Sequence, residues 1–191
     1  MKSINDLPLR DKHVCPWWLA YTFDNPLRAL LHDPRKILAP YLREGMTAVD
    51  LGCGMGYFSR GMAKIVGDAG RVIAVDLQQE MLDITHKRAQ RDGVAHRIQL
   101  QKVEQGNIGV IGQADFALAF WMAHEVEDAP SFFRQVFSVL KPGGTLLVAE
   151  PKMHVSKPRF EELMRFAQEV GFTTSSTPCI RFSRAAVLTK R

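Results

Sequence analysis

A glycine-rich stretch, V-D-L-G-C-G-M-G-Y-F-S, occupies residues 49–59. Its glycines, Gly52, Gly54 and Gly56, alternate with other residues and follow an apolar run that carries Asp50. Glycine adopts a positive φ readily, and because it has no Cβ it lets the backbone approach a ligand closely. The stretch therefore predicts a loop that borders a nucleotide-like ligand.

The spacing of these glycines argues against a phosphate site. The dinucleotide fingerprint is G-x-G-x-x-G, whereas the sequence here is G-x-G-x-G, and Phe58 stands two positions beyond Gly56. A P-loop needs G-K-S/T, which the stretch lacks. Asp50 would repel a pyrophosphate and suits a cationic ligand or ordered water better. A turn that merely packs a strand on a helix is the simpler alternative.

A second carboxylate, Asp76, ends the apolar run V-I-A-V-D. At the end of the second strand of a nucleotide-binding sheet, an acidic side chain accepts hydrogen bonds from ribose hydroxyls. It would repel a 2′-phosphate, which argues against NADP. Taken alone, Asp76 could instead be an exposed helix N-cap. The combination of Asp50, the glycine loop and Asp76 is more specific than any of its members.

Alternating strands and helices must position these groups. Unbroken apolar strands that alternate with helices are typical of a parallel sheet covered on both faces, a doubly wound α/β fold whose ligand lies at the carboxyl ends of the strands. The last helix is amphipathic from Phe160 to Ala167. The expected strands span 47–51, 71–77, 97–103, 114–120, 145–150, 172–180 and 183–190, and the expected helices span 57–66, 78–92 and 130–140.

Residues 1–45 predict a helical extension in front of the main domain, 46–191. Within it, Asp24-Asn25-Pro26 and Asp33-Pro34 each place a capping side chain before a proline suited to a first helical turn. Gly45 is expected to end the extension as a helix C-cap.

Composition narrows the class of protein. With 191 residues, 46% hydrophobic and 24% charged, the chain is typical of one globular domain. No apolar run approaches the roughly 20 residues that cross a bilayer, and no secretory signal is predicted. The cysteines, Cys15, Cys53 and Cys179, form no CxxC pair. We therefore expect no metal site, no disulfide framework and a cytoplasmic location.

The charge is uneven along the chain. Residues 151–191 carry eight Lys and Arg against three Asp and Glu, while the whole chain has a net charge of +5. A basic terminal segment suits an anionic partner such as RNA, and it is equally compatible with an ordinary solvated surface.

Four segments carry a family resemblance: V-D-L-G-C-G-M-G, V-I-A-V-D-L, A-D-F-A-L-A-F-W-M-A-H-E-V and L-K-P-G-G-T-L-L-V-A-E-P. They resemble the successive motifs of class I S-adenosylmethionine-dependent methyltransferases, in particular the small-molecule type 11, or UbiE/arsenite-like, group. The resemblance covers about residues 46–191. It implies a Rossmann-like, seven-stranded sheet in the order 3-2-1-4-5-7-6 with the last strand antiparallel.

The same resemblance implies a site for S-adenosyl-L-methionine. The glycine loop would border the methionine moiety, and Asp50 would help hold its ammonium group, directly or through water. Asp76 would bind the ribose hydroxyls, and Leu77 would lie against the adenine. The family often has an aspartate after the third strand; here Glu104 or a main-chain contact would replace it. The expected cofactor-binding residues are Asp50, Gly52, Cys53 (a small side chain beneath the loop), Gly54, Gly56, Asp76, Leu77, Val103, Glu104 and Phe120.

The methyl acceptor is expected beyond the fourth and fifth strands. His124 titrates near neutral pH and could act as a base, although the family often has a histidine there that only orders the loop. The aromatic residues of the N-terminal extension suit a lid over the acceptor, or simple packing of a helix on the sheet. The catalytic candidates are His124, Glu125 and His154, and the acceptor-binding candidates are Trp17, Trp18, Tyr21 and Trp121.

These features favour transfer of a methyl group to a small molecule by a monomer or homodimer. Nucleic acid is not expected as the acceptor because the fourth strand is not followed by N/D-P-P-Y and no RNA-binding module is appended. The alternatives are an RNA methyltransferase that uses the basic C-terminal surface and a protein that binds S-adenosylmethionine without catalysis.

Overall fold

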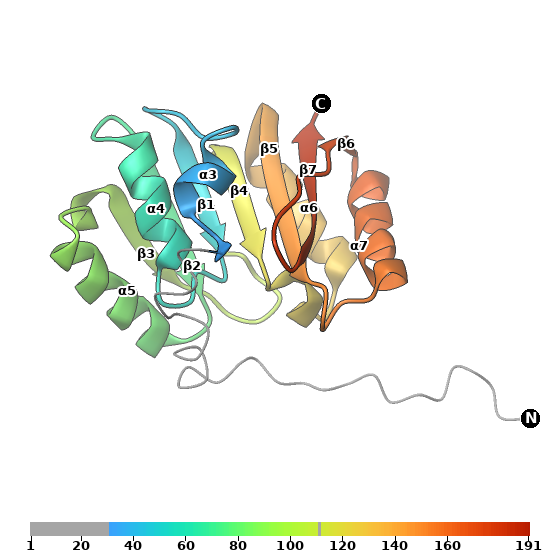
Figure 1. Cartoon of the computed structure of the whole chain (residues 1–191), viewed down its shortest axis with the longest axis horizontal. Helices are drawn as coiled ribbons and strands as arrows, with labels where there is room; N and C mark the ends of the chain where they lie inside the picture. The colour runs from blue at the N-terminus through green and yellow to red at the C-terminus, as the bar shows by residue number, and fades with distance from the viewer. Residues whose placement is uncertain (1–30, 111) are drawn as a thin grey trace, which may run out of the picture.

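The computed structural model describes residues 31–110 and 112–191, and in them the strands form one seven-stranded sheet with the order β3-β2-β1-β4-β5-β7-β6 (Figure 1). The strands β1 to β5 run parallel to one another, whereas β7 runs antiparallel to both β5 and β6. The predicted strand order and the antiparallel last strand are confirmed. The strands are β1 (Thr47–Leu51), β2 (Arg71–Asp76), β3 (Ile98–Lys102), β4 (Ala114–Phe120), β5 (Leu140–Pro151), β6 (Phe172–Ser176) and β7 (Ser183–Lys190).

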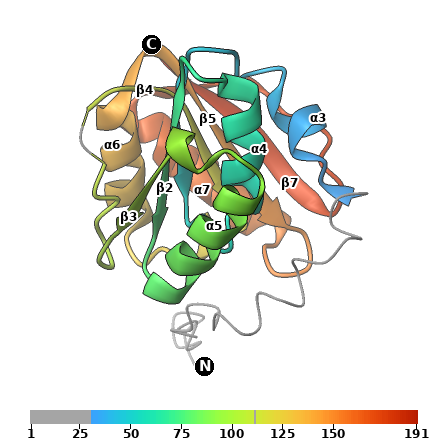
Figure 2. The same ribbon diagram turned by 90° about the vertical axis from the view of Figure 1, so that its left-hand side faces the viewer.

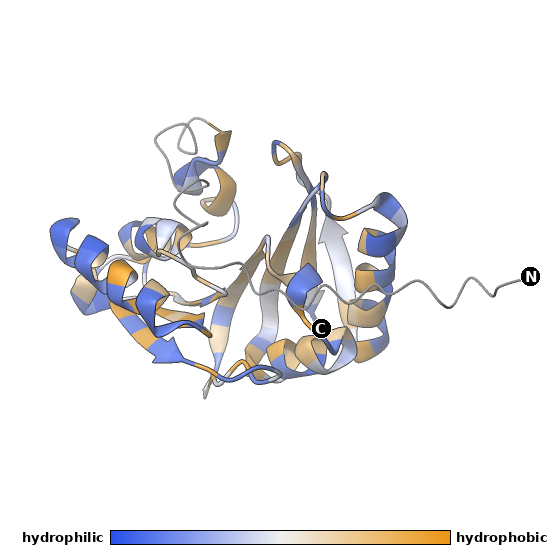
Figure 3. Ribbon diagram, turned by 90° about the horizontal axis from the view of Figure 1, so that it is seen from below, coloured by the Kyte–Doolittle hydropathy of each residue, from blue (hydrophilic) through white to orange (hydrophobic). Residues whose placement is uncertain are grey.

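Helices cover both faces of the sheet, as expected for a doubly wound fold (Figure 2). α3 and α4 pack on one face and α6 and α7 on the other. Each helix turns its apolar side to the strands, and Figure 3 shows hydrophilic residues on the outward helix surfaces. The α-helices are α3 (Pro34–Leu38), α4 (Tyr57–Val66), α5 (Gln79–Arg91), α6 (Ala129–Val139) and α7 (Lys157–Val170), and the 3-10 turns are η2 (Ala95–Arg97) and η3 (Ala123–Glu125).

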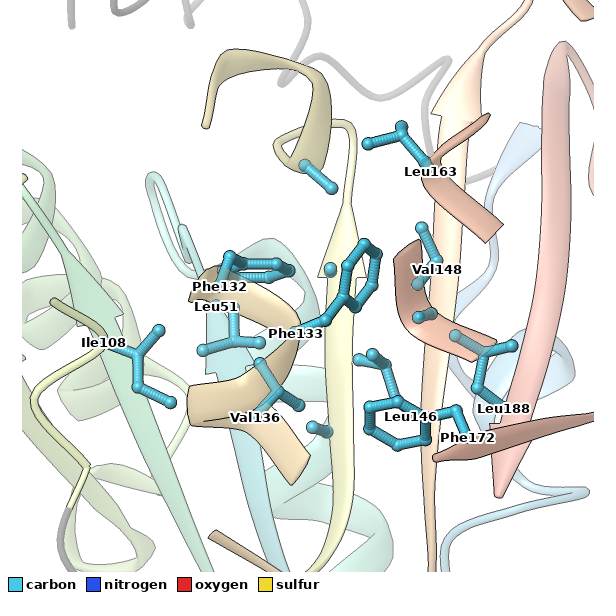
Figure 4. Packing of buried hydrophobic residues seen from close by; sticks show 14 of the residues in the cluster. Leu51, Ile108, Phe132, Phe133, Val136, Leu146, Val148, Leu163, Phe172 and Leu188 are labelled. Atoms are coloured by element: carbon cyan, nitrogen blue, oxygen red, sulfur yellow. The ribbon is translucent and has the colours of Figure 1, made fainter. Parts of the chain in front are cut away.

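The core lies on both faces of the sheet because its central strands have no polar face. In β4, Phe116 and Leu118 pack under α3 and α4, whereas Ala117 and Ala119 face α6 and α7. The small alanines leave room for the large side chains of α6, including the fully buried Phe133 (Figure 4). Continuous burial of this kind fixes the register of each strand, since a slip by one residue would exchange the two faces.

One of the predicted helix caps of the N-terminal extension lies in its described part and is confirmed. Asp33 is the N-cap of α3 and accepts a hydrogen bond from the Arg35 N–H at 2.9 Å, and the helix ends at Leu38 with Ala39 as its C-cap. Gly45 is not a helix cap, because it lies in the turn before β1 with a φ of 79°. The lid candidates Trp17, Trp18 and Tyr21, and the predicted cap at residues 24–26, lie outside the described residues.

Two strands differ in length from the prediction. β5 begins at Leu140, because Leu140 already pairs with Ala114 before the K-P-G-G segment, and an irregularity in register follows. β6 ends at Ser176 rather than at residue 180. Pro178, which lacks an N–H and cannot donate to a ladder, lies in the loop that replaces its last residues. In the described part of the chain, no helix combines the length and the apolar character needed to cross a membrane.

Candidate functional site

A cavity of about 390 Å³ opens at the carboxyl ends of β1, β2 and β4. This is the place that the doubly wound fold predicts for a ligand, and the volume is in the range of small-molecule sites, about 300–1,000 Å³. The residues expected from the sequence that line the cavity are Gly52, Gly54, Asp76, Leu77, Val103, Glu104, Trp121 and Glu125.

The glycine loop between β1 and α4 has three positive φ values, 66° at Gly52, 53° at Gly54 and 73° at Gly56. A Cβ on Gly54 would meet no atom within 4 Å, and Gly54 lines the cavity, so the missing side chain there leaves space for a ligand. A Cβ on Gly56 would instead lie 2.5 Å from Cγ2 of Thr85. The missing Cβ at Gly54 leaves room for a ligand, whereas the missing Cβ at Gly56 allows the loop to pack on α5.

Asp76 joins this loop to the end of β2. One carboxylate oxygen accepts from the Gly54 N–H at 2.8 Å, and the other accepts from the Gln78 N–H at 2.9 Å. Burial raises the pKa of Asp76, and these backbone N–H groups partly offset the effect. A carboxylate has about four lone-pair positions, so the two backbone bonds leave acceptor capacity toward the cavity, as a ribose diol requires.

Asp50 lies beneath the glycine loop. It is 3% exposed, its carboxylate accepts from the Ser59 hydroxyl at 2.5 Å, and it is not among the residues that line the cavity.

Cys53 packs beside Ala74 and Leu82 beneath the loop. Burial, reinforced by the charges of Asp50 and Asp76, raises the pKa of the Cys53 thiol well above its ordinary value. Gly56 and Phe120 also lie behind the cavity wall rather than in it.

The far wall of the cavity comes from the segment after β3. Val103 and Glu104 line it, and the Val103 N–H donates to the Asp76 carbonyl at 3.0 Å. Gln135, on α6, fixes the rest of this glycine-rich segment, since its side-chain amide accepts from Ile108 N–H at 3.0 Å and donates to the Gly106 carbonyl at 2.8 Å. Sequence reasoning missed Gln135, because one polar side chain on a helix carries no signal of its partners.

The residues after β4 divide into two groups. His124 does not line the cavity; its Nδ1 is hydrogen-bonded to Glu150, a fully buried carboxylate that also accepts from the Ala123 N–H at 2.8 Å. Burial by itself lowers the pKa of His124, but the hydrogen bond and charge of Glu150 outweigh it, so the pKa lies above its ordinary value. His154, whose ring centroid lies 6.4 Å from that of His124, is exposed and outside the cavity wall.

Glu125, next to His124 in the chain, does line the cavity. Its side chain is exposed to solvent. Desolvation by the surrounding protein is nevertheless the main effect on its carboxyl group and raises its pKa, and the positive charge of His124 opposes the shift. Glu125 is therefore the one catalytic candidate among these residues that could reach a bound molecule.

Trp121 forms another part of the wall and has a φ of 60°, which is unusual for a residue with a large side chain. Its indole N–H donates to the Ser183 hydroxyl at 2.9 Å, and its backbone N–H donates to the Ala149 carbonyl at 2.7 Å. The ring of His32 meets the indole edge to face at 5.1 Å. Three separate elements thus hold Trp121 in place.

The charge of the cavity favours a cationic ligand. Its lining contains five carboxylates and none of the described Lys, Arg or His side chains. S-adenosylmethionine carries a sulfonium and an ammonium group, and its ribose needs an acceptor such as Asp76, so the residues present fit this cofactor. No group of three His, Cys, Asp or Glu suited to a metal ion occurs in residues 31–110 and 112–191. The five carboxylates are Asp76, Glu104, Glu125, Glu127 and Asp128.

Comparison with known proteins shows which family the chain is similar to. The model of a family described as "Methyltransferase domain" matches residues 42–178. The demethylmenaquinone methyltransferase of Lactobacillus johnsonii is 31% identical over 110 residues, which are 57% of this chain and 45% of that protein. A ubiquinone/menaquinone biosynthesis C-methyltransferase of Haemophilus ducreyi, UbiE, is 29% identical over 132 residues, 69% of this chain and 49% of that protein. The chain thus spans about half the length of these curated relatives.

Among solved structures, a SAM-dependent methyltransferase from Aquifex aeolicus superposes with a TM-score of 0.82 at 24% identity, over 93% of this chain and 100% of that one. This likeness supports the fold. The chain belongs to the methyltransferase domain family, and within it to the class I S-adenosylmethionine-dependent, UbiE-like group that its motifs resemble.

Proposed function

We propose that the protein binds S-adenosylmethionine and transfers a methyl group from it to a small aromatic acceptor. The observation that carries the proposal is the acidic cavity in which Asp76 and the open face of Gly54 meet. The names of the relatives, which include C-methyltransferases and an O-methyltransferase of quinone biosynthesis, support a hydroxylated, quinol-like ring as the acceptor. When bound, S-adenosylmethionine supplies an electrophilic methyl group on its sulfonium.

Several side chains that line the cavity have separate proposed roles. Asp76 accepts hydrogen bonds from the ribose, and the Gly52 and Gly54 backbone borders the methionine end. Glu125 accepts the proton that a hydroxylated acceptor loses as its ring or oxygen is methylated, and a raised pKa makes a carboxylate a better base near neutral pH. Trp121 offers a flat wall to the acceptor ring. The role of His124 is positional, since its bond to Glu150 fixes the turn that carries Glu125.

Other expectations remain proposals of the same kind. Asp50 would act on the methionine ammonium group only through water or a rearranged Ser59, given its place beneath the loop. Trp17, Trp18 and Tyr21 would close over the acceptor, and His154 would lie at the rim. We propose a monomer or homodimer that works in the cytoplasm and does not methylate nucleic acid.

Calorimetric binding of S-adenosylhomocysteine tests the cofactor site. Asp76→Asn keeps the shape of the side chain but removes its charge and half of its acceptor capacity, and we expect at least tenfold weaker binding. Asp83→Asn, a substitution of an exposed aspartate on α5, is the matched control and should bind as the natural protein does. Equal binding by both variants, or no binding by the natural protein, would refute the proposed site.

Transfer of a radiolabelled methyl group to a panel of hydroquinones and catechols tests the reaction. Glu125→Gln should lose most of the rate while S-adenosylhomocysteine binding stays within about twofold, because Glu125 is proposed to act on the acceptor. A protein that binds the cofactor tightly but methylates no member of the panel would favour a non-catalytic role.

A further inference from the structure

Two large apolar side chains are exposed in the described part of the molecule, Met153 at 91% and Phe182 at 52%. They come from different loops, the connection from β5 to α7 and the connection from β6 to β7. The loops lie side by side, because the Lys152 N–H donates to the Phe182 carbonyl at 2.9 Å. The Arg184 guanidinium, at the start of β7, also donates to the Val155 carbonyl at 3.1 Å and holds the loop after β5 against β7.

The backbone conformation of Phe182 is unusual. Its φ is 59°, a region in which a residue with a Cβ is strained by about 1–2 kcal/mol. Glycine would take this conformation without strain, and an aromatic side chain that is half exposed gains little from burial in return. Such an outlier, held by the Lys152 bond on one side, is a reasonable pointer to a function of the exposed ring.

The charged residues of the two loops are both basic. The loops, residues 152–156 and 177–182, contain Lys152 and Arg181 and no Asp or Glu. Lys152 and Arg181 are exposed, and neither belongs to an ion pair found within the described ranges. The Arg181 guanidinium lies over the Phe182 ring, 5.6 Å from its centroid. We call Lys152, Met153, Arg181 and Phe182 the basic-apolar patch.

The patch lies next to the cavity. Ser183, the neighbour of Phe182, accepts the hydrogen bond that holds Trp121 in the cavity wall. In Figure 1 both loops lie at the lower end of the sheet, where β1 and β4 also point their carboxyl ends. A surface that engages the basic-apolar patch would therefore face the side of the molecule on which the cavity opens.

The composition of the patch fits a lipid surface better than a protein. A stable protein interface buries roughly 800 Å² on each partner, whereas this patch has two apolar side chains at the tips of two loops. Apolar tips that enter the acyl boundary, with Lys and Arg beside them for anionic headgroups, are the features of peripheral membrane attachment. We propose that the basic-apolar patch docks the protein on the surface of a bilayer that contains anionic lipids.

Sedimentation with lipid vesicles tests the proposal. The protein should bind vesicles of phosphatidylcholine with 30% phosphatidylglycerol, as about that share of anionic headgroups gives a negative surface, and should bind pure phosphatidylcholine at least tenfold less. Binding should weaken as salt is raised from low to physiological concentration. Equal binding to both kinds of vesicle, or to neither, would overturn the proposal.

Two double variants separate the contributions. Lys152→Glu with Arg181→Glu should reduce vesicle binding at least tenfold; Lys87→Glu with Arg91→Glu, which makes the same change of net charge on the exposed side of α5, should leave it within about twofold. Met153→Ser with Phe182→Gly should also reduce binding, and glycine suits the positive φ, so this variant is expected to fold at least as well. An equal loss of vesicle binding in the α5 control would indicate that binding depends on net charge alone, and it would refute the proposed role of the patch.

Single-stranded RNA is the competing ligand. If polyuridylate binds the protein, loses affinity in Lys152→Glu with Arg181→Glu, and vesicles do not bind, the surface is one for nucleic acid and the membrane proposal is wrong. Binding of S-adenosylhomocysteine, measured on the same variants, should not change. The vesicle experiment therefore tests membrane binding independently of the proposed methyltransferase function.

Discussion

Replacing Gly54 or Gly56 with alanine should have separable effects, although both glycines belong to one loop. Both residues have a positive φ, 53° and 73°, so either alanine should cost about 1 kcal/mol of stability through backbone strain. At Gly54 the added Cβ meets no atom within 4 Å and projects where the ligand is proposed to lie. At Gly56 the Cβ would stand 2.5 Å from Cγ2 and 2.7 Å from Oγ1 of Thr85.

The contact at Gly56 sets the magnitude. Thr85 is fully buried, and its hydroxyl donates to the Gly54 carbonyl at 2.9 Å, so it cannot move aside without losing that bond. Overpacking of a buried site costs typically about 1–3 kcal/mol. Gly56→Ala should therefore lose about 2–4 kcal/mol in all, and Gly54→Ala only about 1 kcal/mol, which in a domain of this size is a melting shift of about 2–4 °C per kcal/mol.

The assay is urea unfolding together with calorimetric binding of S-adenosylhomocysteine. We expect Gly54→Ala to weaken binding at least tenfold with little loss of stability, and Gly56→Ala to lose stability first. Adding Thr85→Ala to Gly56→Ala removes the two closest atoms, so the double-mutant cycle should show a favourable coupling of at least about 1 kcal/mol. Equal stability losses in the two single variants, or unchanged binding in Gly54→Ala, would refute this reading of the loop.

Three further predictions concern the pair behind the cavity, the thiols and the core. The pKa of His124 is raised in the folded protein, so the stability that its bond to Glu150 contributes is fully present below the unfolded pKa of about 6.5 and is lost as the pH rises through the folded pKa. The free energy of unfolding in urea should therefore differ most between His124→Gln and the natural protein near pH 6, and least near pH 9. Cys179 is exposed and should be alkylated by iodoacetamide before the buried Cys53, with mass spectrometry of peptides as the readout. Phe133→Ala should cost about 3–5 kcal/mol by chemical unfolding, because the ring is fully buried between α6 and the sheet.

Much of the fold could be predicted because its strands are hydrophobic on both faces. A run such as A-D-F-A-L-A-F is not suited to a solvated edge, and four such runs, β1, β2, β4 and β5, among the helices leave few arrangements other than a parallel sheet covered on both sides. The order of the last two strands came from the family resemblance. The ends of β5 and β6 were predicted less well, since a local irregularity and a proline in the next loop, rather than hydrophobicity, decide them.

The cofactor side of the site was easier to predict than the acceptor side. The spacing of the glycines and the position of Asp76 are local signals in the sequence, and Gly52, Gly54 and Asp76 line the cavity. The pairing of His124 with Glu150 joins the turn η3 to the strand β5, so no pattern along the chain could reveal that Glu125 and not His124 would face the cavity. The same holds for Trp121, whose indole N–H donates to Ser183 at the start of β7.

The position of β7 has a consequence for how the chain folds. β7 lies between β5 and β6, so β5, an apolar strand that ends at Pro151, lacks one neighbour until the chain through Lys190 has been synthesised and has folded back. Pairing across such a sequence separation is slow, and an unpaired apolar edge invites association with other chains. During synthesis, the growing protein therefore presents an open sheet edge beside α7, and the arrival of β7 is the event that closes it.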